Sequence, residues 1–152
     1  MKLSKIILAL LFVINLNAKY DVGDTLSNDI LNKLQLKQDK VYVLDFFAAW
    51  CVSCKIELPL ISKLNINLDK SKYQIIGINV DENINEGKSF VKDLALNFDI
   101  VYDNTNNIIS KFEPIGVPAI YYIKNNKVQK VIFGAVHNID TQILNDLKNI
   151  GE

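Results

Sequence analysis

The sequence predicts an α/β domain in which a mixed central β-sheet is flanked by helices on both faces. Two nearly continuous runs of apolar and β-branched residues, 41–47 and 73–80, are typical of buried central strands. The segment after each run has apolar residues at three- and four-residue spacing, which is typical of a helix that crosses back over a sheet. The 152 residues are 49% hydrophobic, which is enough for one core, so folding does not need disulfide bonds.

Each element follows from a local pattern. After the first long strand, Ile56, Leu60 and Ile61 share one face of a helix. Later in the chain, the pair Asn125-Asn126 can supply the positive φ angles of a hairpin turn. The predicted elements, in chain order, are a helix at 29–34, a strand at 41–47, a helix at 51–64, a strand at 73–80, a helix at 84–96, a strand at 99–103, a helix at 105–112 ended by Pro114, strands at 119–123 and 128–133, and a helix from 140 or 141 to 149.

The first 18 residues have the pattern of a secretory signal. Lys2 and Lys5 precede an apolar run, and Ala18 provides the small residue at its end. The run is shorter than the roughly 20 apolar residues of a membrane-spanning helix, so we expect cleavage. An uncleaved anchor stays open, because Leu16 is not the small residue usually found two places before the cut. The predicted organisation is a signal peptide at 1–18, an N-terminal extension at 19–40 and the folded domain at 41–152.

The charge pattern argues against nucleic acid as a partner. All 17 basic residues are lysines, and 17 acidic residues balance them without a basic cluster. The chain therefore lacks both a basic patch and the arginine forks that bind phosphate groups in a bidentate way.

The only cysteines, Cys51 and Cys54, stand directly after Trp50 at the predicted start of a helix. A structural zinc site needs four ligands, and the chain adds only one histidine, His137. A disulfide across so short a loop contributes little stability, so a structural bridge does not explain the placement. A helix N-terminus favours a thiolate at Cys51, and Cys54 lies within reach of a sulfur bonded to Cys51. We therefore expect thiol–disulfide exchange, in which Cys51 attacks and Cys54 resolves.

Residues 44–59, LDFFAAWCVSCKIELP, resemble the active-site segment of the thioredoxin superfamily, and most of all that of the TlpA-like periplasmic reductases, which include cytochrome c maturation proteins. Glu57 and Pro59, the strand and helix inserted between 73 and 102, and the segment GVPAIYYI support the resemblance. It covers about residues 41–149. It implies a thioredoxin fold with an inserted strand–helix unit, a periplasmic location and chemistry without a cofactor.

The resemblance also implies roles for individual residues. Pro118 would be a cis-proline that faces the disulfide, and Val117 would offer its backbone to a substrate strand. Trp50 would cover the active-site surface, although a plain packing role is equally open.

Two acidic residues are candidates for handling the proton of Cys54. Asp45 lies inside an apolar strand six residues before Cys51, where an ionised carboxylate is costly unless it has a task or a partner. An acid at this spacing in thioredoxin itself handles the proton of the resolving cysteine, so Asp45 is our first choice. Glu57, one turn beyond Cys54, is the second.

The expected function is that of a periplasmic thiol–disulfide oxidoreductase that reduces protein disulfides. Its expected partners are exported proteins with disulfide bonds, with apocytochrome c as one class that the resemblance implies. A membrane thiol electron donor would restore the dithiol.

The sequence leaves three alternatives to this function. A disulfide oxidant or isomerase would use the same cysteine couple with a different direction of electron flow. That direction is open, because Val52 and Ser53 stand between the cysteines, where the family usually has proline at the second position, and this dipeptide helps set the reduction potential. A Cu(I)-binding assembly module would use Cys51, Cys54 and His137 as ligands. A peroxidase is less expected, because the threonine-x-x-cysteine site of peroxiredoxins is absent from the sequence.

Overall fold

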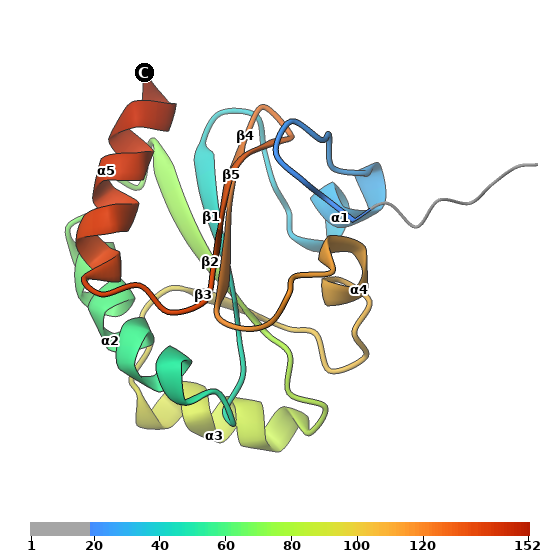
Figure 1. Ribbon diagram of the computed structural model, residues 1–152, viewed down its shortest axis with the longest axis vertical. Coiled ribbons are helices and arrows are strands. Elements are labelled where there is room, and N and C mark those ends of the chain that lie inside the picture. The colour runs from blue at the N-terminus through green and yellow to red at the C-terminus, as the bar shows by residue number, and fades with distance from the viewer. Residues whose placement is uncertain (1–18) are drawn as a thin grey trace, which may run out of the picture.

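The computed structural model describes residues 19–152, so the predicted signal peptide at 1–18 lies outside the described residues. Figure 1 shows a central sheet with helices on both sides. The helices are α1 (Asn28–Lys33), α2 (Val52–Ile66), α3 (Ile84–Asp93), α4 (Ile109–Phe112) and α5 (Ile139–Gly151). The strands are β1 (Val41–Phe47), β2 (Tyr73–Asn79), β3 (Asp99–Tyr102), β4 (Ala119–Lys124) and β5 (Lys127–Phe133). None of the helices within this part of the chain is long and apolar enough to cross a membrane.

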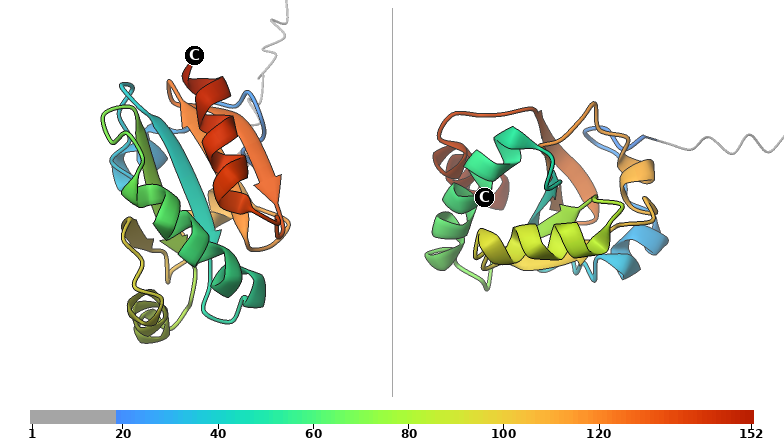
Figure 2. Two further views of the ribbon diagram at one scale, coloured as in Figure 1. Left: turned by 90° about the vertical axis from the view of Figure 1, so that its left-hand side faces the viewer. Right: turned by 90° about the horizontal axis from the view of Figure 1, so that it is seen from below.

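The five strands form one mixed sheet in the order β3-β2-β1-β4-β5. β1 and β2 pair in parallel, as do β2 and β3, whereas β4 is antiparallel to both β1 and β5. Helices α2 and α5 lie side by side on one face, and α1 and α4 lie on the other (Figures 1 and 2). Helix α3 lies at the end of the sheet where β1 ends (Figure 2). The predicted mixed sheet, flanked by helices and with an inserted strand–helix unit, is confirmed.

Strand β1 is the centre of the core. All seven of its residues are buried, which agrees with its continuous apolar run. On the α4 side, the ring of Phe46 contacts those of Phe112 and Tyr121, with ring centroids 5.0 and 5.6 Å away. These aromatic contacts fix α4 and β4 against β1, and therefore fix the segment between α4 and β4 at the end of the sheet.

The N-terminal extension packs onto the domain. Helix α1 is capped by Ser27, whose hydroxyl accepts a hydrogen bond from the Ile30 backbone. Thr25 forms an isolated β-bridge with Lys127 of β5. The extension also contributes four side chains to the core: Tyr20, Leu26, Ile30 and Leu34.

Two helices begin at positions that the sequence did not indicate. Helix α4 begins at Ile109 instead of 105, because the Asp103 carboxylate accepts hydrogen bonds from the backbone of Ile108 and Ile109 and sets the start of the helix there. Helix α5 begins at Ile139 after Asn138, which has a φ of 58° and makes no side-chain capping bond, so neither Asp140 nor Thr141 is the cap. The hairpin turn predicted at Asn125-Asn126 is confirmed, because both residues have positive φ angles between β4 and β5.

Candidate active site

Several loops meet at one end of the sheet. Ala119 of β4 pairs with Phe46 of β1, so the segment before β4 begins where β1 ends. Phe133 pairs with the same Ala119, which brings the end of β5 to this edge as well. The backbone N–H of Val80 donates to the carbonyl of Phe47, 2.9 Å away, and ties the end of β2 to the end of β1. A site built here therefore draws residues from four strand ends and from the start of α2.

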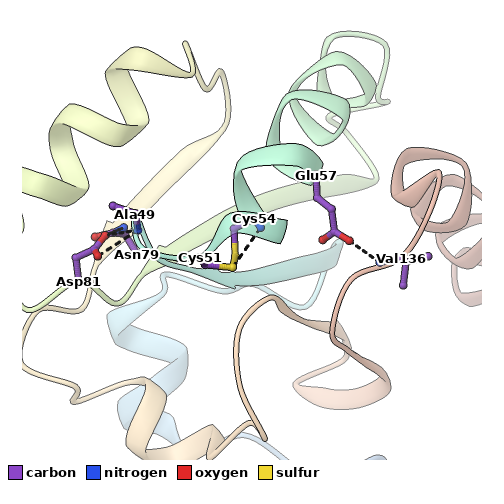
Figure 3. Close-up of a disulfide and its surroundings, with 7 residues drawn as sticks. All are labelled: Ala49, Cys51, Cys54, Glu57, Asn79, Asp81 and Val136. Carbon is purple, nitrogen blue, oxygen red and sulfur yellow. Dashed lines mark hydrogen bonds between the residues drawn. A yellow bond between two sulfur atoms is a disulfide. The ribbon is translucent and has the colours of Figure 1, made fainter.

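The two cysteines form a disulfide at the start of α2 (Figure 3). Cys51 is the N-cap residue, and its sulfur accepts a hydrogen bond from the backbone N–H of Cys54 at 3.2 Å. Cys51 is 6% exposed and Cys54 is 1% exposed. Because the first N–H groups of a helix stabilise negative charge, this position favours a Cys51 thiolate once the bond is reduced. Cys51 is also the sulfur that an incoming partner can reach more easily.

The segment before β4 carries the predicted cis-proline. The Val117–Pro118 peptide bond is cis, as the resemblance implies. Pro118 is buried and Val117 is half-buried. The carbonyl of Pro118 accepts a hydrogen bond from Gly134 at 2.9 Å, so this segment is fixed to the loop after β5. The structure thus places Val117 and Pro118 at the same end of the sheet as the disulfide.

Asp45 lies in the middle of β1 and is only 2% exposed. Burial raises the pKa of its carboxyl group well above the usual value, and the nearby charge of Glu57 raises it further. A carboxylate with a raised pKa is a stronger base at neutral pH than an ordinary aspartate.

Glu57 lies on α2, one turn beyond Cys54, and is 4% exposed. Its carboxylate accepts a hydrogen bond from the backbone N–H of Val136, in the loop between β5 and α5 (Figure 3). Burial raises the pKa of Glu57, and the Val136 hydrogen bond partly opposes this effect. Phe46 packs toward α4, so its neighbour Asp45 faces the other side of the sheet, on which α2 and Glu57 lie.

Trp50 is 69% exposed, so its side chain is not part of the core. It borders an open groove between the loop before Cys51 and helix α3, with Phe90 of α3 on the other side. Val52 and Ile56, on the first turns of α2 after Cys51, are also large apolar residues with exposed side chains. An exposed apolar surface beside a reactive bond is a typical recognition surface for another protein.

Two residues of the site have no counterpart in the sequence predictions. Asp81, which is 3% exposed, accepts hydrogen bonds from the backbone N–H of Ala49 at 2.9 and 3.1 Å. Asn79 donates to the same carboxylate at 2.7 Å (Figure 3). A usable signal existed in the sequence, because both polar residues stand where a buried parallel strand ends, at the edge where sites form in α/β sheets.

His137 lies in the loop between β5 and α5. His137 is exposed and lines a small hollow together with Ser53, Ile56 and Glu57. Within residues 19–152, no group of three or more His, Cys, Asp or Glu side chains is placed to hold a metal ion.

Comparison with known proteins shows which chains this one is similar to. The model of the AhpC/TSA family matches residues 15–131. The thiol-disulfide oxidoreductase ResA of Geobacillus thermodenitrificans is 27% identical over 127 residues, which cover 78% of this chain and 73% of the relative. ResA of Bacillus thuringiensis is 29% identical over 124 residues, covering 76% and 72% of the two chains.

Solved structures of low sequence identity share the fold. A thiol:disulfide interchange protein DsbE from Chlorobium tepidum superimposes with a TM-score of 0.76 at 18% identity, covering 88% of this chain and all of the other. A secreted disulfide oxidoreductase of Mycobacterium tuberculosis gives a TM-score of 0.63 at 22% identity, covering 74% and 83% of the two chains. The predicted thioredoxin fold is thereby confirmed.

Proposed function

The chain belongs to the AhpC/TSA family and is a thiol–disulfide oxidoreductase, and we propose that it works as an exported reductant of protein disulfides. The observation that carries the proposal is the Cys51–Cys54 disulfide at the start of α2, together with the buried carboxyl groups of Asp45 in β1 and Glu57 in α2.

The reaction has two exchange steps. The Cys51 thiolate attacks one sulfur of a partner's disulfide, that S–S bond breaks, and the released partner thiolate takes up a proton. Cys54 then loses its proton and attacks the Cys51 sulfur, which releases the second partner thiol. Two electrons pass to the partner, and the protein is left with the disulfide that the structure contains.

We propose that Asp45 accepts the proton of Cys54 in the second step. Its raised pKa makes it a suitable base, and it faces the side of the sheet on which α2 lies. Glu57 supports this role, because a negative charge on Glu57 makes Asp45 more basic. Trp50, Val117 and Pro118 would bind the partner chain around the disulfide.

The acidic surroundings of Cys54 support the reducing direction. Strong disulfide oxidants owe their potential to a stabilised reduced form, in which positive groups or dipoles favour the thiolate. Here Asp45 and Glu57 disfavour a negative charge on Cys54, so the dithiol form gains less stabilisation. The couple is therefore expected to give electrons away.

The location and partners belong to the same proposal. Residues 1–18 would direct export, residues 19–152 would work in the periplasm, and a membrane thiol donor would restore the dithiol. Exported proteins with disulfide bonds would be the substrates, and apocytochrome c is one class. The relatives that match carry the name of thiol-disulfide oxidoreductases, and one structural neighbour is described as secreted.

The test is the reduction of a model disulfide protein, insulin, by the pre-reduced full chain. We expect reduction with one disulfide cleaved for each Cys51–Cys54 bond formed, and none by the Cys51→Ser variant. Failure of the wild-type protein to reduce insulin or any other disulfide protein, with intact dithiol, would contradict the proposal.

A further inference from the structure

A buried carboxylate outside the catalytic pair holds the segment that leads into Cys51. Asp81 follows the end of β2, and both of its oxygens accept hydrogen bonds from the backbone N–H of Ala49, two residues before Cys51. At 3% exposure the carboxylate is shielded from water, so these bonds are strong compared with bonds at the surface. Ala49 is therefore fixed to β2 through a side chain and not only through the sheet.

The next contact holds Asp81 itself. Asn79, the last residue of β2, is fully buried and donates a hydrogen bond to the Asp81 carboxylate at 2.7 Å. The backbone carbonyl of Asn79 also accepts a hydrogen bond from the N–H of Asp103 at 2.8 Å. Because Asn79 is fixed through both its backbone and its side chain, it limits the positions that Asp81 can take.

Helix α3 completes the arrangement. Gly87 of α3 lies directly against Asn79, and a Cβ atom at Gly87 would come within 2.1 Å of the Asn79 side-chain oxygen. A glycine in a helix interior costs about 1 kcal/mol relative to alanine, so its presence needs a reason. The close approach of α3 to Asn79 supplies one.

These contacts form a continuous path from the inserted strand–helix unit to the nucleophile. We infer that Asp81, held by Asn79 against Gly87, is a positioning residue that sets the Ala49–Cys51 segment for attack by Cys51. Asp81 touches no reacting atom and transfers no proton or electron. It holds the start of α2 in the geometry in which the Cys51 sulfur caps the helix. The inference deepens the proposed function and rests on it for its effect on substrates.

The structure offers a matched control for a purely structural role. Asp103 is also 3% exposed, also follows a parallel strand, and also accepts backbone hydrogen bonds, here from Ile108 and Ile109. Within the described residues, its side chain bonds to the start of α4 and not to the segment before Cys51. Loss of Asp103 should lower stability about as much as loss of Asp81.

The first experiment measures the rate at which iodoacetamide alkylates reduced Cys51 across a range of pH, and kcat and KM for insulin reduction. We expect Asp81→Ala to shift the alkylation profile to higher pH and to lower kcat/KM at least tenfold. Asp81→Asn, which keeps an oxygen for Ala49, should recover most of both. Asp103→Ala should keep the wild-type profile. A wild-type profile in Asp81→Ala, or an equal shift in Asp103→Ala, would overturn the inference.

The second experiment changes Gly87, the residue of this path that is farthest from Cys51 along the contacts. Gly87→Ala should slow alkylation of Cys51, although residue 87 lies on α3 and alanine is the better helix former. Adding Gly87→Ala to Asn79→Ala should change the rate little, because the side chain with which the new methyl group collides is gone. Equal effects of Gly87→Ala in both backgrounds would contradict the path through Asn79.

Alkylation reports on Cys51 without a protein substrate, so the two proposals can fail separately. If the wild-type protein does not reduce insulin but Asp81→Ala still shifts the alkylation profile, the proposed function is wrong and the positioning role stands. If insulin is reduced equally well by wild type and Asp81→Ala, the positioning role is wrong and the function stands.

Discussion

Asp45 of β1 and Glu57 of α2 are buried near each other, and the charge of Glu57 raises the pKa of Asp45 beyond the effect of burial. Glu57 has a hydrogen bond from Val136 that stabilises its ionised form, so Glu57 ionises more readily than Asp45, which becomes a strong base once it is ionised. The first two predictions follow from this relationship.

Asp45→Asn should make the protein more stable at neutral pH. The folded-state pKa of Asp45 lies above the unfolded value of about 3.8, so the stability that protonated Asp45 contributes is fully present below that value and is lost as the pH rises through the folded pKa. Asparagine does not ionise and avoids this loss. Thermal unfolding should give similar Tm values for variant and wild type near pH 3.5, and a gap in favour of the variant that widens toward pH 8. A difference in Tm that stays constant with pH would contradict a raised pKa of the buried Asp45.

The same substitution should slow the release of the partner. Removing the base for Cys54 should lower the rate of mixed-disulfide resolution by about a hundredfold, the lower end of what general base catalysis contributes. Rapid mixing of reduced protein with a disulfide peptide should show normal formation of the mixed disulfide and slow resolution. Glu57→Gln should have a smaller effect, because Asp45 keeps its carboxyl group. A larger effect of Glu57→Gln than of Asp45→Asn would mean that Glu57, and not Asp45, accepts the proton of Cys54.

Cys54→Ser should trap partners. Without the second thiol, Cys51 can form the mixed disulfide but cannot resolve it, so covalent complexes should accumulate and disappear on addition of a reducing agent. Complexes from a periplasmic extract can be identified by mass spectrometry, with Cys51→Ser as the control. If Cys54→Ser captures no protein while the wild type reduces small disulfides, the substrates are not proteins.

Trp50→Ala should weaken substrate binding without loss of stability. Trp50 is 69% exposed, so its removal costs the core little, but an aromatic anchor at an interface is worth about 2 kcal/mol or more. KM for insulin should rise more than tenfold with Tm unchanged. Ile66→Ala is the matched control, since Ile66 is 71% exposed and lies at the end of α2, far from Cys51. An equal change of KM in both variants would show that Trp50 has no part in recognition.

The proposed export also has a direct measurement. When the full chain is expressed with a C-terminal tag in a bacterium that has a periplasm, the mature protein should begin at Lys19. N-terminal sequencing of the periplasmic fraction tests this expectation. A membrane-bound product that retains Met1 would mean that residues 1–18 act as an anchor.

Local patterns in the sequence were sufficient for the elements that carry the disulfide. Strand β1 and helix α2 could be predicted because burial on both faces leaves a continuous apolar run and a helix leaves a 3.6-residue period. A helix boundary that depends on a side chain outside the helix could not be predicted in the same way. The start of α4 at Ile109, which the Asp103 carboxylate sets, is an example.

The hydrogen bonds that hold the site together could not be predicted, for a related reason. The bond from Ala49 to Asp81 joins residues 32 apart in the chain, and the bond from Val136 to Glu57 joins residues 79 apart. Neither partner can be inferred from spacing, because each depends on how two loops meet at the end of the sheet. Cys51, Cys54 and Asp45 could be singled out as candidates because the chemistry of each is unusual at its own position.

The reduction potential of the Cys51–Cys54 couple tests the central claim most directly. The full chain is equilibrated with mixtures of reduced and oxidised glutathione, and the fraction of dithiol is measured by alkylation. A reductant should give a potential near or below about −250 mV, on the thioredoxin side of the scale. A potential near about −120 mV would make the protein an oxidant and would contradict the proposed function.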